Sequence, residues 1–343
     1  MSGDIVNRRF ICEGGLNTNE NDLVLSPETP GAATRLVNYE SSASGGYRRI
    51  NGYVPYDTDF PEVAPGESEG RILGVVGFWN TTTRVFDFFA ARKDAGANTY
   101  SIYRNAQGSG WIKETLPAPR EMIGQFNTVY RLRFTELNYG GGSHLVAVDG
   151  VNKILWYNGT EWKEIHQQPT QVEPPEGEDY PDLPEPGGDQ AIESPSLVAV
   201  FKNHVFVARD DGNESVIAHS APLQVDEWRV AQGAGQIFPG FDVMAIKPWR
   251  DELYVFGLSQ IKKIVVEGTN FVLKDVTAEI GCLATDSVVE MGGSLIFLSQ
   301  DGIRPVAGTD KINDVELGLL SRDIQPEMED LIANGDLTEL FAV

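Results

Sequence analysis

The four histidines and the many carboxylates are the residues whose types could support acid–base or metal chemistry. The histidines are His144, His166, His204 and His219. Their spacing matches neither H-E-x-x-H nor H-x-H, so a zinc hydrolase has no support. The sequence also has no G-x-S-x-G nucleophile elbow and no phosphate-binding loop. With 50 Asp and Glu residues, some pair will stand at glycosidase separation by chance. We therefore expect no enzyme, no catalytic or metal-binding residues and no cofactor.

Two loops could be mistaken for ligand sites. The stretch DDGNE (210–214) has oxygen ligands that suit calcium, but it lies between two apolar runs and favours a hairpin turn. The stretch GAGQIFPG (233–240) has two close glycines without a strand-to-helix context, so it is interpreted as a loop.

The charge of the chain limits its partners. The 343 residues carry 27 Lys and Arg against 50 Asp and Glu, a formal net charge of −23. Affinity for nucleic acid comes from clustered cations, so ordinary nucleic-acid binding is disfavoured and a phosphate-repelling surface is favoured. The start of the chain has no apolar signal region, and no apolar run approaches membrane-spanning length, so we expect synthesis in the cytoplasm and no membrane span. Cys12 and Cys282 show no metal or disulfide-framework spacing, and their pairing stays open.

Short apolar runs separated by turn residues predict strands rather than helices. Four predicted hairpins join HLVAVDG to KILWY, HVFVARDDG to SVIAH, ELYVFGL to KKIVV, and SLIFLSQDG to IRPVA. The best helical pattern lies near the end of the chain, where Ser321 is the candidate N-cap, Pro326 falls in the first turn and Gly335 ends the helix.

An aromatic residue recurs after a turn and predicts a repeat. It is Trp111, Trp162, Trp228 or Phe271, at spacings of 51, 66 and 43 residues. The longest spacing includes an acidic insertion at 168–190, and without it the period is about 40 to 50 residues, as in β-propeller blades. We expect these four residues to pack the blades. A sugar-stacking platform is the alternative interpretation, but no polar side chains repeat at fixed offsets beside them.

These patterns together predict an all-β, β-propeller-like fold of about five or six blades, with an extended N-terminal arm and a C-terminal helix. The expected domains are an arm with short strands at 1–56, a propeller at 57–310 that carries the insertion 168–190, and a helical segment at 311–343. The final run ELFAV resembles the start of a strand, which raises the expectation that the chain is a fragment of a longer protein.

Two adjacent cations interrupt the acidic character of the arm. Arg48 and Arg49 lie in GGYRRINGY (45–53). In one interpretation, one arginine faces solvent and the other pairs with a local carboxylate. In the other, both are candidates for docking to a neighbouring subunit or adaptor.

Three stretches carry a family resemblance. They are EGGLNTNENDLVLSPETPGAATRLVNYESSASGGYRRINGY, MAIKPWRDELYVFGLSQIKKIVVEG (244–268) and GCLATDSVVEMGGSLIFLSQDGIRPVAG (281–308). Together they resemble the tail nozzle proteins of short-tailed double-stranded-DNA bacteriophages, also described as tail tubular or packaged-DNA stabilisation proteins. The individual motifs are blade motifs that other virion propellers share, and the insertion 168–190 has no place in the family pattern.

The resemblance implies a structural role in the virion. It implies a homo-oligomeric ring, usually a hexamer, that docks below the portal and adaptor, contacts tail fibre or spike proteins and surrounds the DNA-ejection channel. Genomic DNA would pass through without specific binding, and a negatively charged wall suits that passage. The alternatives are a virion propeller that recognises a host receptor or glycan, and a propeller glycosidase.

Overall fold

The computed structural model describes residues 14–20, 31–42, 46–52, 54, 70–106, 110–124, 128–165, 194–210, 212–306, 319–338 and 340–342. The insertion 168–190, the linker 57–69, Cys12 and His166 lie outside them. The chain forms two compact units, one of residues 1–56 with 283–343 and one of residues 57–282. We describe each unit by itself.

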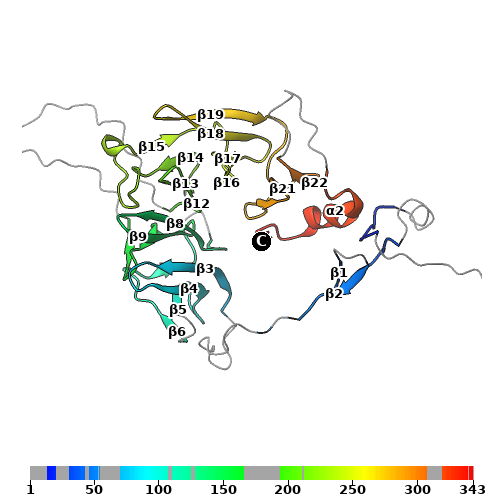
Figure 1. Ribbon diagram of the computed structural model, residues 1–343, viewed down its shortest axis with the longest axis horizontal. Coiled ribbons are helices and arrows are strands. Elements are labelled where there is room, and N and C mark those ends of the chain that lie inside the picture. Colours follow the sequence, from blue (N-terminus) through cyan, green and yellow to red (C-terminus); the bar gives the residue numbers. More distant parts are fainter. Residues whose placement is uncertain are drawn as a thin grey trace, which may run out of the picture. The chain divides into compact units, whose positions relative to one another are not determined.

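The unit of residues 57–282 holds four antiparallel sheets whose strands follow chain order (Figure 1). The first sheet contains β3 (Ile72–Asn80), β4 (Val85–Lys93), β5 (Thr99–Ala106) and β6 (Trp111–Lys113), with β7 (Arg120–Glu121) also paired to β5. The second contains β8 (Arg133–Tyr139), β9 (Gly142–Val148), β10 (Leu155–Tyr157) and β11 (Trp162–Glu164). The third contains β12 (Leu197–Phe201), β13 (His204–Asp210), β14 (Asn213–His219) and β15 (Gly235–Ile237), with a short 3-10 helix at Val230–Gln232. The fourth contains β16 (Ala245–Trp249), β17 (Glu252–Phe256), β18 (Ile261–Glu267) and β19 (Asn270–Thr277).

Alternation of apolar and polar residues explains these strands. The predicted hairpins are confirmed as the pairs β9–β10, β13–β14 and β17–β18 in this unit, and β21–β22 in the other. The hairpin predicted for the stretch 210–214 is confirmed, because Asp210 of β13 pairs with Asn213 of β14. Asp210 also accepts a hydrogen bond from the Ser194 amide at 2.7 Å, so its carboxylate holds the segment that enters β12.

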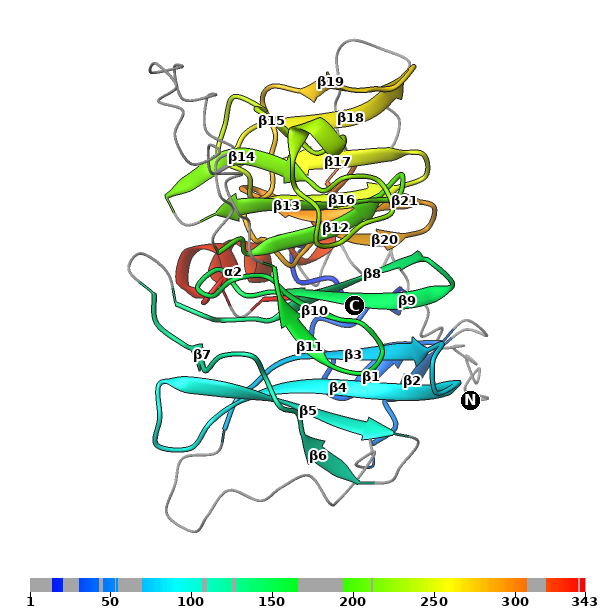
Figure 2. The same ribbon diagram turned by 90° about the vertical axis from the view of Figure 1, so that its left-hand side faces the viewer.

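The four sheets stack face to face, and each interface encloses its own apolar core (Figure 2). The first and second sheets share a core that includes Phe78, Phe89, Leu145 and Tyr157. The second and third sheets share one that includes Val146, Ile154, Val205 and Val207. The third and fourth share one that includes Phe206, Ile217, Leu253 and Val255. A sheet of this size cannot bury both faces alone, so each sheet depends on its neighbours.

The first strand of each sheet lies on the inner side of the stack, with β12 beside both β8 and β16 (Figure 1). Meander sheets that stack in this way, each with its first strand innermost, define a β-propeller-like fold. The predicted all-β, propeller-like class is thus confirmed.

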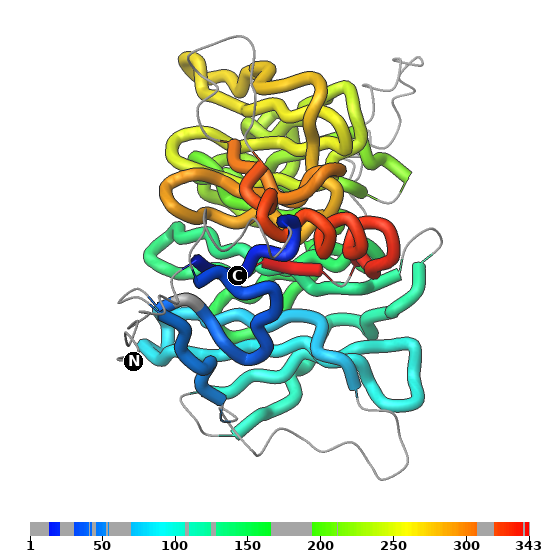
Figure 3. The backbone as a smooth tube through the Cα atoms, turned by 90° about the vertical axis from the view of Figure 1, so that its right-hand side faces the viewer, coloured from blue at the N-terminus to red at the C-terminus, as the bar shows by residue number. Residues whose placement is uncertain are grey.

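The other unit joins the two ends of the chain (Figure 3). It contains the hairpin of β1 (Tyr39–Ser41) and β2 (Tyr47–Arg49), and a three-stranded sheet of β20 (Val289–Met291), β21 (Ser294–Ser299) and β22 (Gly302–Pro305). The amides of Thr18 and Asn19 donate to the carbonyl of Asp323, at 2.9 and 3.3 Å. Backbone hydrogen bonds therefore hold the arm against the C-terminal segment.

The predicted C-terminal helix is present. A 3-10 turn (Arg322–Ile324) leads into α2 (Gln325–Asn334), with Pro326 in the first turn and Gly335 directly after the last residue. The Ser321 hydroxyl does not cap the helix; it accepts a hydrogen bond from the Ile303 amide at 3.1 Å.

The compact units divide the chain differently from the expected domains. From the sequence we expected one propeller domain at 57–310, whereas the structure divides the chain into two units after Cys282. The sheet of β20 to β22 therefore belongs to the same unit as the arm and the C-terminal helix. Backbone hydrogen bonds between distant segments, such as Thr18 to Asp323, create this grouping and leave no local sequence signal.

Candidate functional site

The two arginines of the arm lie side by side on β2. The Arg48 guanidinium Nε donates to Glu40 Oε1 at 2.7 Å, directly across the β1–β2 hairpin. Both side chains are largely exposed, at 69% and 45%, so this ion pair contributes little to folding. Arg49 is also exposed and stands opposite Tyr39. Arg48 thus pairs with a local carboxylate, as one of the two interpretations of the sequence predicted. Both arginines remain accessible to solvent.

The recurring aromatic residues occupy similar but not identical places. Trp111 opens β6, Trp162 opens β11 and Phe271 lies in β19, each in the last strand of a sheet. Trp162 is 4% exposed within the core shared by the first and second sheets. Trp228 lies in the loop before β15, packs against the core of the second and third sheets, and donates from Nε1 to the Val225 carbonyl at 2.9 Å. Phe271 packs against the core of the third and fourth sheets, and Trp111 is partly buried.

Trp162 belongs to an aromatic cluster that joins the first two sheets. Its ring lies 5.4 Å from Phe89 and 5.2 Å from Tyr157, and Tyr157 lies 5.8 Å from Phe78. The Phe89–Trp162 and Phe78–Tyr157 pairs are edge-to-face, a favourable geometry for aromatic rings. Burial raises the pKa of Tyr157 to about 12, so its hydroxyl stays protonated at neutral pH.

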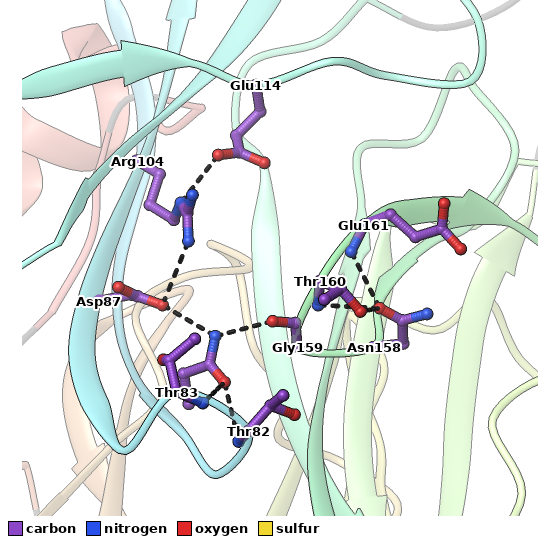
Figure 4. Close-up of polar contacts among 10 residues, drawn as sticks. Thr82, Thr83, Asp87, Arg104, Glu114, Asn158, Gly159, Thr160 and Glu161 are labelled. Atoms are coloured by element: carbon purple, nitrogen blue, oxygen red, sulfur yellow. Dashed lines mark hydrogen bonds and ion pairs between the residues drawn. The ribbon is translucent and has the colours of Figure 1, made fainter.

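A polar network borders this cluster and ties the two sheets together (Figure 4). The buried Asn80 amide donates to Asp87 Oδ2 at 3.1 Å and to the Gly159 carbonyl at 2.8 Å. Its oxygen accepts the amides of Thr82 and Thr83, which shapes the β3–β4 turn. Asn80 therefore links a turn of the first sheet to a turn of the second.

Charged groups complete the network. Arg104 donates from Nε to Glu114 Oε1 at 2.9 Å and approaches Asp87 Oδ2 with an Nη at 3.8 Å. The Asp87 side chain is 1% exposed and the Glu114 side chain 11% exposed. Burial raises the pKa of Glu114, and the Arg104 guanidinium partly offsets this shift. Both carboxylates are therefore held by one arginine.

A second buried joint links the same two sheets. Arg120 of β7, 2% exposed, donates to Glu164 of β11 at 2.7 Å and also to the Lys153 carbonyl. The Tyr100 hydroxyl of β5 donates to Asp149 at 2.5 Å, and burial, followed by the Asp149 charge, raises the pKa of Tyr100. Both interactions connect strands of one sheet to residues of the next.

The three described histidines take part in packing. His204 and His219 each bring Nδ1 to the Ser220 carbonyl, at 2.6 and 3.1 Å, and their rings lie 5.1 Å apart beside Phe206 and Phe271. Burial lowers the pKa of His219, which favours the neutral ring. His144 stacks on Tyr139 at 4.1 Å, and burial lowers its pKa as well.

Within the described ranges, no group of three or more His, Cys, Asp or Glu side chains could hold a metal ion. Across those same residues, no helix is long and apolar enough to cross a membrane. Cys282 is buried.

Sequence reasoning missed the two polar joints. One signal was available, because Asp87 interrupts the apolar run VFDFFAA of β4 and a charged residue at a core position needs a partner. The partner could not be identified, since Arg104 belongs to another strand, β5. Arg120 and Glu164 are 44 residues apart.

Comparisons with known proteins show fold-level likeness only. No protein-family model matches the chain, and no curated protein matches it. Among solved structures, BBS1N in its complex with ARL6 aligns at 13% identity and a TM-score of 0.40, over 70% of this chain and 66% of that one. The extracellular domain of the putative hybrid two-component system BT4673 of B. thetaiotaomicron aligns at 10% identity and a TM-score of 0.37, over 72% of this chain and 27% of that one. A putative gluconolactonase aligns at 12% identity and a TM-score of 0.33, over 72% of this chain and 79% of that one. Likeness this distant identifies neither a family nor an activity for this chain.

Proposed function

We propose that this chain is a structural subunit of a phage tail nozzle ring, located in the virion tail, that docks below the portal and adaptor. The observation that carries the proposal is a propeller-like stack whose first two sheets are joined by the buried Arg120–Glu164 ion pair, in a chain of net charge −23. Buried, paired charges fix geometry, and a rigid scaffold is what a ring subunit needs.

The charge suits a channel for DNA. A wall of the same sign as the DNA phosphates adsorbs the duplex weakly, so genomic DNA passes without sticking. Retention of a packaged genome then requires a constriction rather than tight binding. The ring, its hexameric order and its contacts with the adaptor and with tail fibre or spike proteins rest on the family resemblance.

The docking role of the arm can be tested by charge reversal. In the proposal, Arg49 is a direct contact to an acidic neighbour, and Arg48 is held beside it by Glu40. We expect Arg49→Glu to weaken co-sedimentation with purified portal–adaptor complexes at least tenfold. Arg84→Glu, at another exposed arginine in the β3–β4 turn, is the matched control and should leave co-sedimentation unchanged. Equal co-sedimentation of wild type and Arg49→Glu would remove the arm from the docking surface.

A second candidate function is a virion module that recognises a receptor or glycan. It is favoured by exposed aromatic residues on the first sheet, where Trp79 is 48% and Phe86 39% exposed, because aromatic rings can stack on sugars. Glycan-array binding that is lost in Trp79→Ser would favour this function over the nozzle.

A further inference from the structure

The first sheet has one face in a core and one face turned away from the second sheet. Strand register places Val75, Gly77 and Trp79 of β3 opposite Ala90, Phe88 and Phe86 of β4. These residues alternate with Val76, Phe78 and Phe89, which pack in the core with the second sheet. Val75 is 61% exposed, Trp79 48% and Phe86 39%. We call the surface formed by Val75, Gly77, Trp79, Phe86 and Phe88 the aromatic face.

The aromatic face is a built surface rather than scattered apolar residues. The Phe86 and Phe88 rings lie 5.0 Å apart in an edge-to-face arrangement. Gly77 lies under the Phe86 ring, and a Cβ atom there would be 2.6 Å from the ring. Contiguous apolar surface of this kind marks interaction sites in soluble proteins.

The sheet that carries this face is cationic within an acidic chain. Residues 71–113 hold six Lys and Arg against two Asp, a net charge of +4, while the whole chain carries −23. Lys113 lies on the same side as the aromatic face, because it pairs with Tyr103, which pairs with Ala90. Its side chain is 61% exposed, and its Nζ lies 3.9 Å from Asp94 Oδ1. Arg84 is exposed in the β3–β4 turn, beside Phe86. A surface of aromatic rings flanked by cations favours a binding segment that is acidic and able to pack on aromatic rings.

The insertion 168–190 has this chemistry. It contains seven Asp and Glu, no Lys or Arg, and six prolines. Proline-rich segments dock against aromatic-lined surfaces, and carboxylates complement a cationic rim. We propose that the aromatic face of the first sheet binds the acidic, proline-rich segment 168–190 of the same chain.

The length of the chain permits this contact. The segment leaves the second sheet after β11, which ends at Glu164, and returns to β12, which begins at Leu197. Half of the 28 residues from 166 to 193 reach about 45 Å when extended. The first sheet is the stacking neighbour of the second, and sheets stack about 10 Å apart, so a path around the edge strand β6 is well within reach. The tether also keeps the effective concentration of the segment high.

Other occupants fit less well. Aromatic rings with a cationic rim also bind single-stranded nucleic acid, but the net charge of −23 opposes its approach. A second copy would bring acidic surface, but it lacks the advantage of the tether. The proposal is independent of the nozzle function, since it concerns a contact within one chain.

Carbodiimide cross-linking of the intact chain tests the contact directly, because this reagent joins only amines and carboxylates that touch. We expect Lys113 to be coupled to a Glu or Asp of 168–190, and the yield to fall at least fivefold in 1 M salt. The Lys202–Asp251 ion pair, at 2.8 Å, is the internal positive control. Coupling at Lys202 with none between residues 71–113 and the segment would overturn the proposal.

Substitution of the aromatic face supplies a second readout. A glutamate-specific protease should cleave within 168–190 at least tenfold faster in the double variant Trp79→Ser, Phe86→Ser than in the wild type. Val266→Ser, at a 40% exposed valine on β18, is the matched control and should not change the rate. Equal cleavage in all three proteins would overturn the proposal. Two other results would also overturn the proposal. One is concentration-dependent self-association that the double variant abolishes, because a second copy would then occupy the face. The other is oligothymidylate binding that the double variant abolishes, because a nucleic acid would then occupy the face.

Discussion

At the scale of single residues, two ion pairs of equal length differ in burial. Arg120 and Glu164 join the first and second sheets at 2.7 Å, while Arg48 and Glu40 make the same 2.7 Å contact on an exposed hairpin. The N–O distance alone would predict equal contributions of the two ion pairs to stability. Burial separates them, since removal of one partner of a buried pair leaves an uncompensated charge.

We therefore expect Arg120→Met to lower the free energy of unfolding by about 3 kcal/mol or more. Arg48→Met is the control at the exposed pair and should cost less than about 1 kcal/mol. Urea denaturation followed by circular dichroism measures both values. Equal losses in the two variants would show that the Arg120 joint does not stabilise the fold.

Trp162 and Trp111 come from the same sequence repeat but differ in burial. Trp162 is 4% exposed among Phe89 and Tyr157, whereas Trp111 is only partly buried. Trp162→Ala should cost about 3–5 kcal/mol, as buried aromatic truncations do, and Trp111→Ala should cost clearly less. Thermal melts of the two variants give the comparison, and an unchanged melting temperature for Trp162→Ala would contradict the packing role.

At the scale of elements, much of the fold was predictable because its signals are local. Period-two alternation and turn residues located the hairpins, and the recurring aromatic marked the last strand of three sheets through Trp111, Trp162 and Phe271. Trp228 lies in a loop because the third sheet reaches its last strand through a longer connection. Some features depend on contacts between segments that are distant in the sequence. The partners in the Arg104 network and the grouping of the arm with the C-terminal helix are examples, and no local sequence pattern predicts them.

The turn at Gly159 is expected to be sensitive to any side chain. Its φ is +96°, and a Cβ atom there would lie 2.9 Å from Thr82 Oγ1 of the first sheet. Gly140 also has a positive φ, of +61°, but nothing lies within 4 Å of its Cβ position. Gly159→Ala should therefore destabilise the chain more than Gly140→Ala, which should cost about 1 kcal/mol. Chemical denaturation of both variants tests the order, and the reverse order would argue against a tight contact between these sheets.

The histidine pair of the third sheet predicts a direction for the pH dependence of stability. Burial lowers the pKa of His219 in the folded state below its ordinary value of about 6.5. As the pH falls below about 6.5, the unfolded chain takes up this proton before the folded chain does, so stability declines until the folded pKa is reached.

We expect His219→Gln to lose less melting temperature between pH 7.5 and pH 5.5 than the wild type loses. Part of the decline should remain, because burial also lowers the pKa of His144. Melting curves at the two pH values provide the measurement. Identical losses in the two proteins would mean that His219 is not held neutral by burial.

At the scale of the whole molecule, the nozzle proposal assigns the net charge of −23 to a channel wall that does not hold DNA. The chain should show no measurable affinity for duplex DNA at 150 mM salt, because phosphate binding requires clustered cations. Filter binding or fluorescence anisotropy tests this affinity, and residues 71–113, with a net charge of +4, are the first region to examine if binding occurs. Tight binding at this salt concentration would contradict a low-friction channel.

The mass of the native particle, measured by light scattering or by negative-stain microscopy in the presence of portal and adaptor, tests the central claim most directly. The nozzle account predicts a closed ring of about six copies around a central opening. A chain that stays monomeric with these partners present would contradict that account and favour the receptor-binding module.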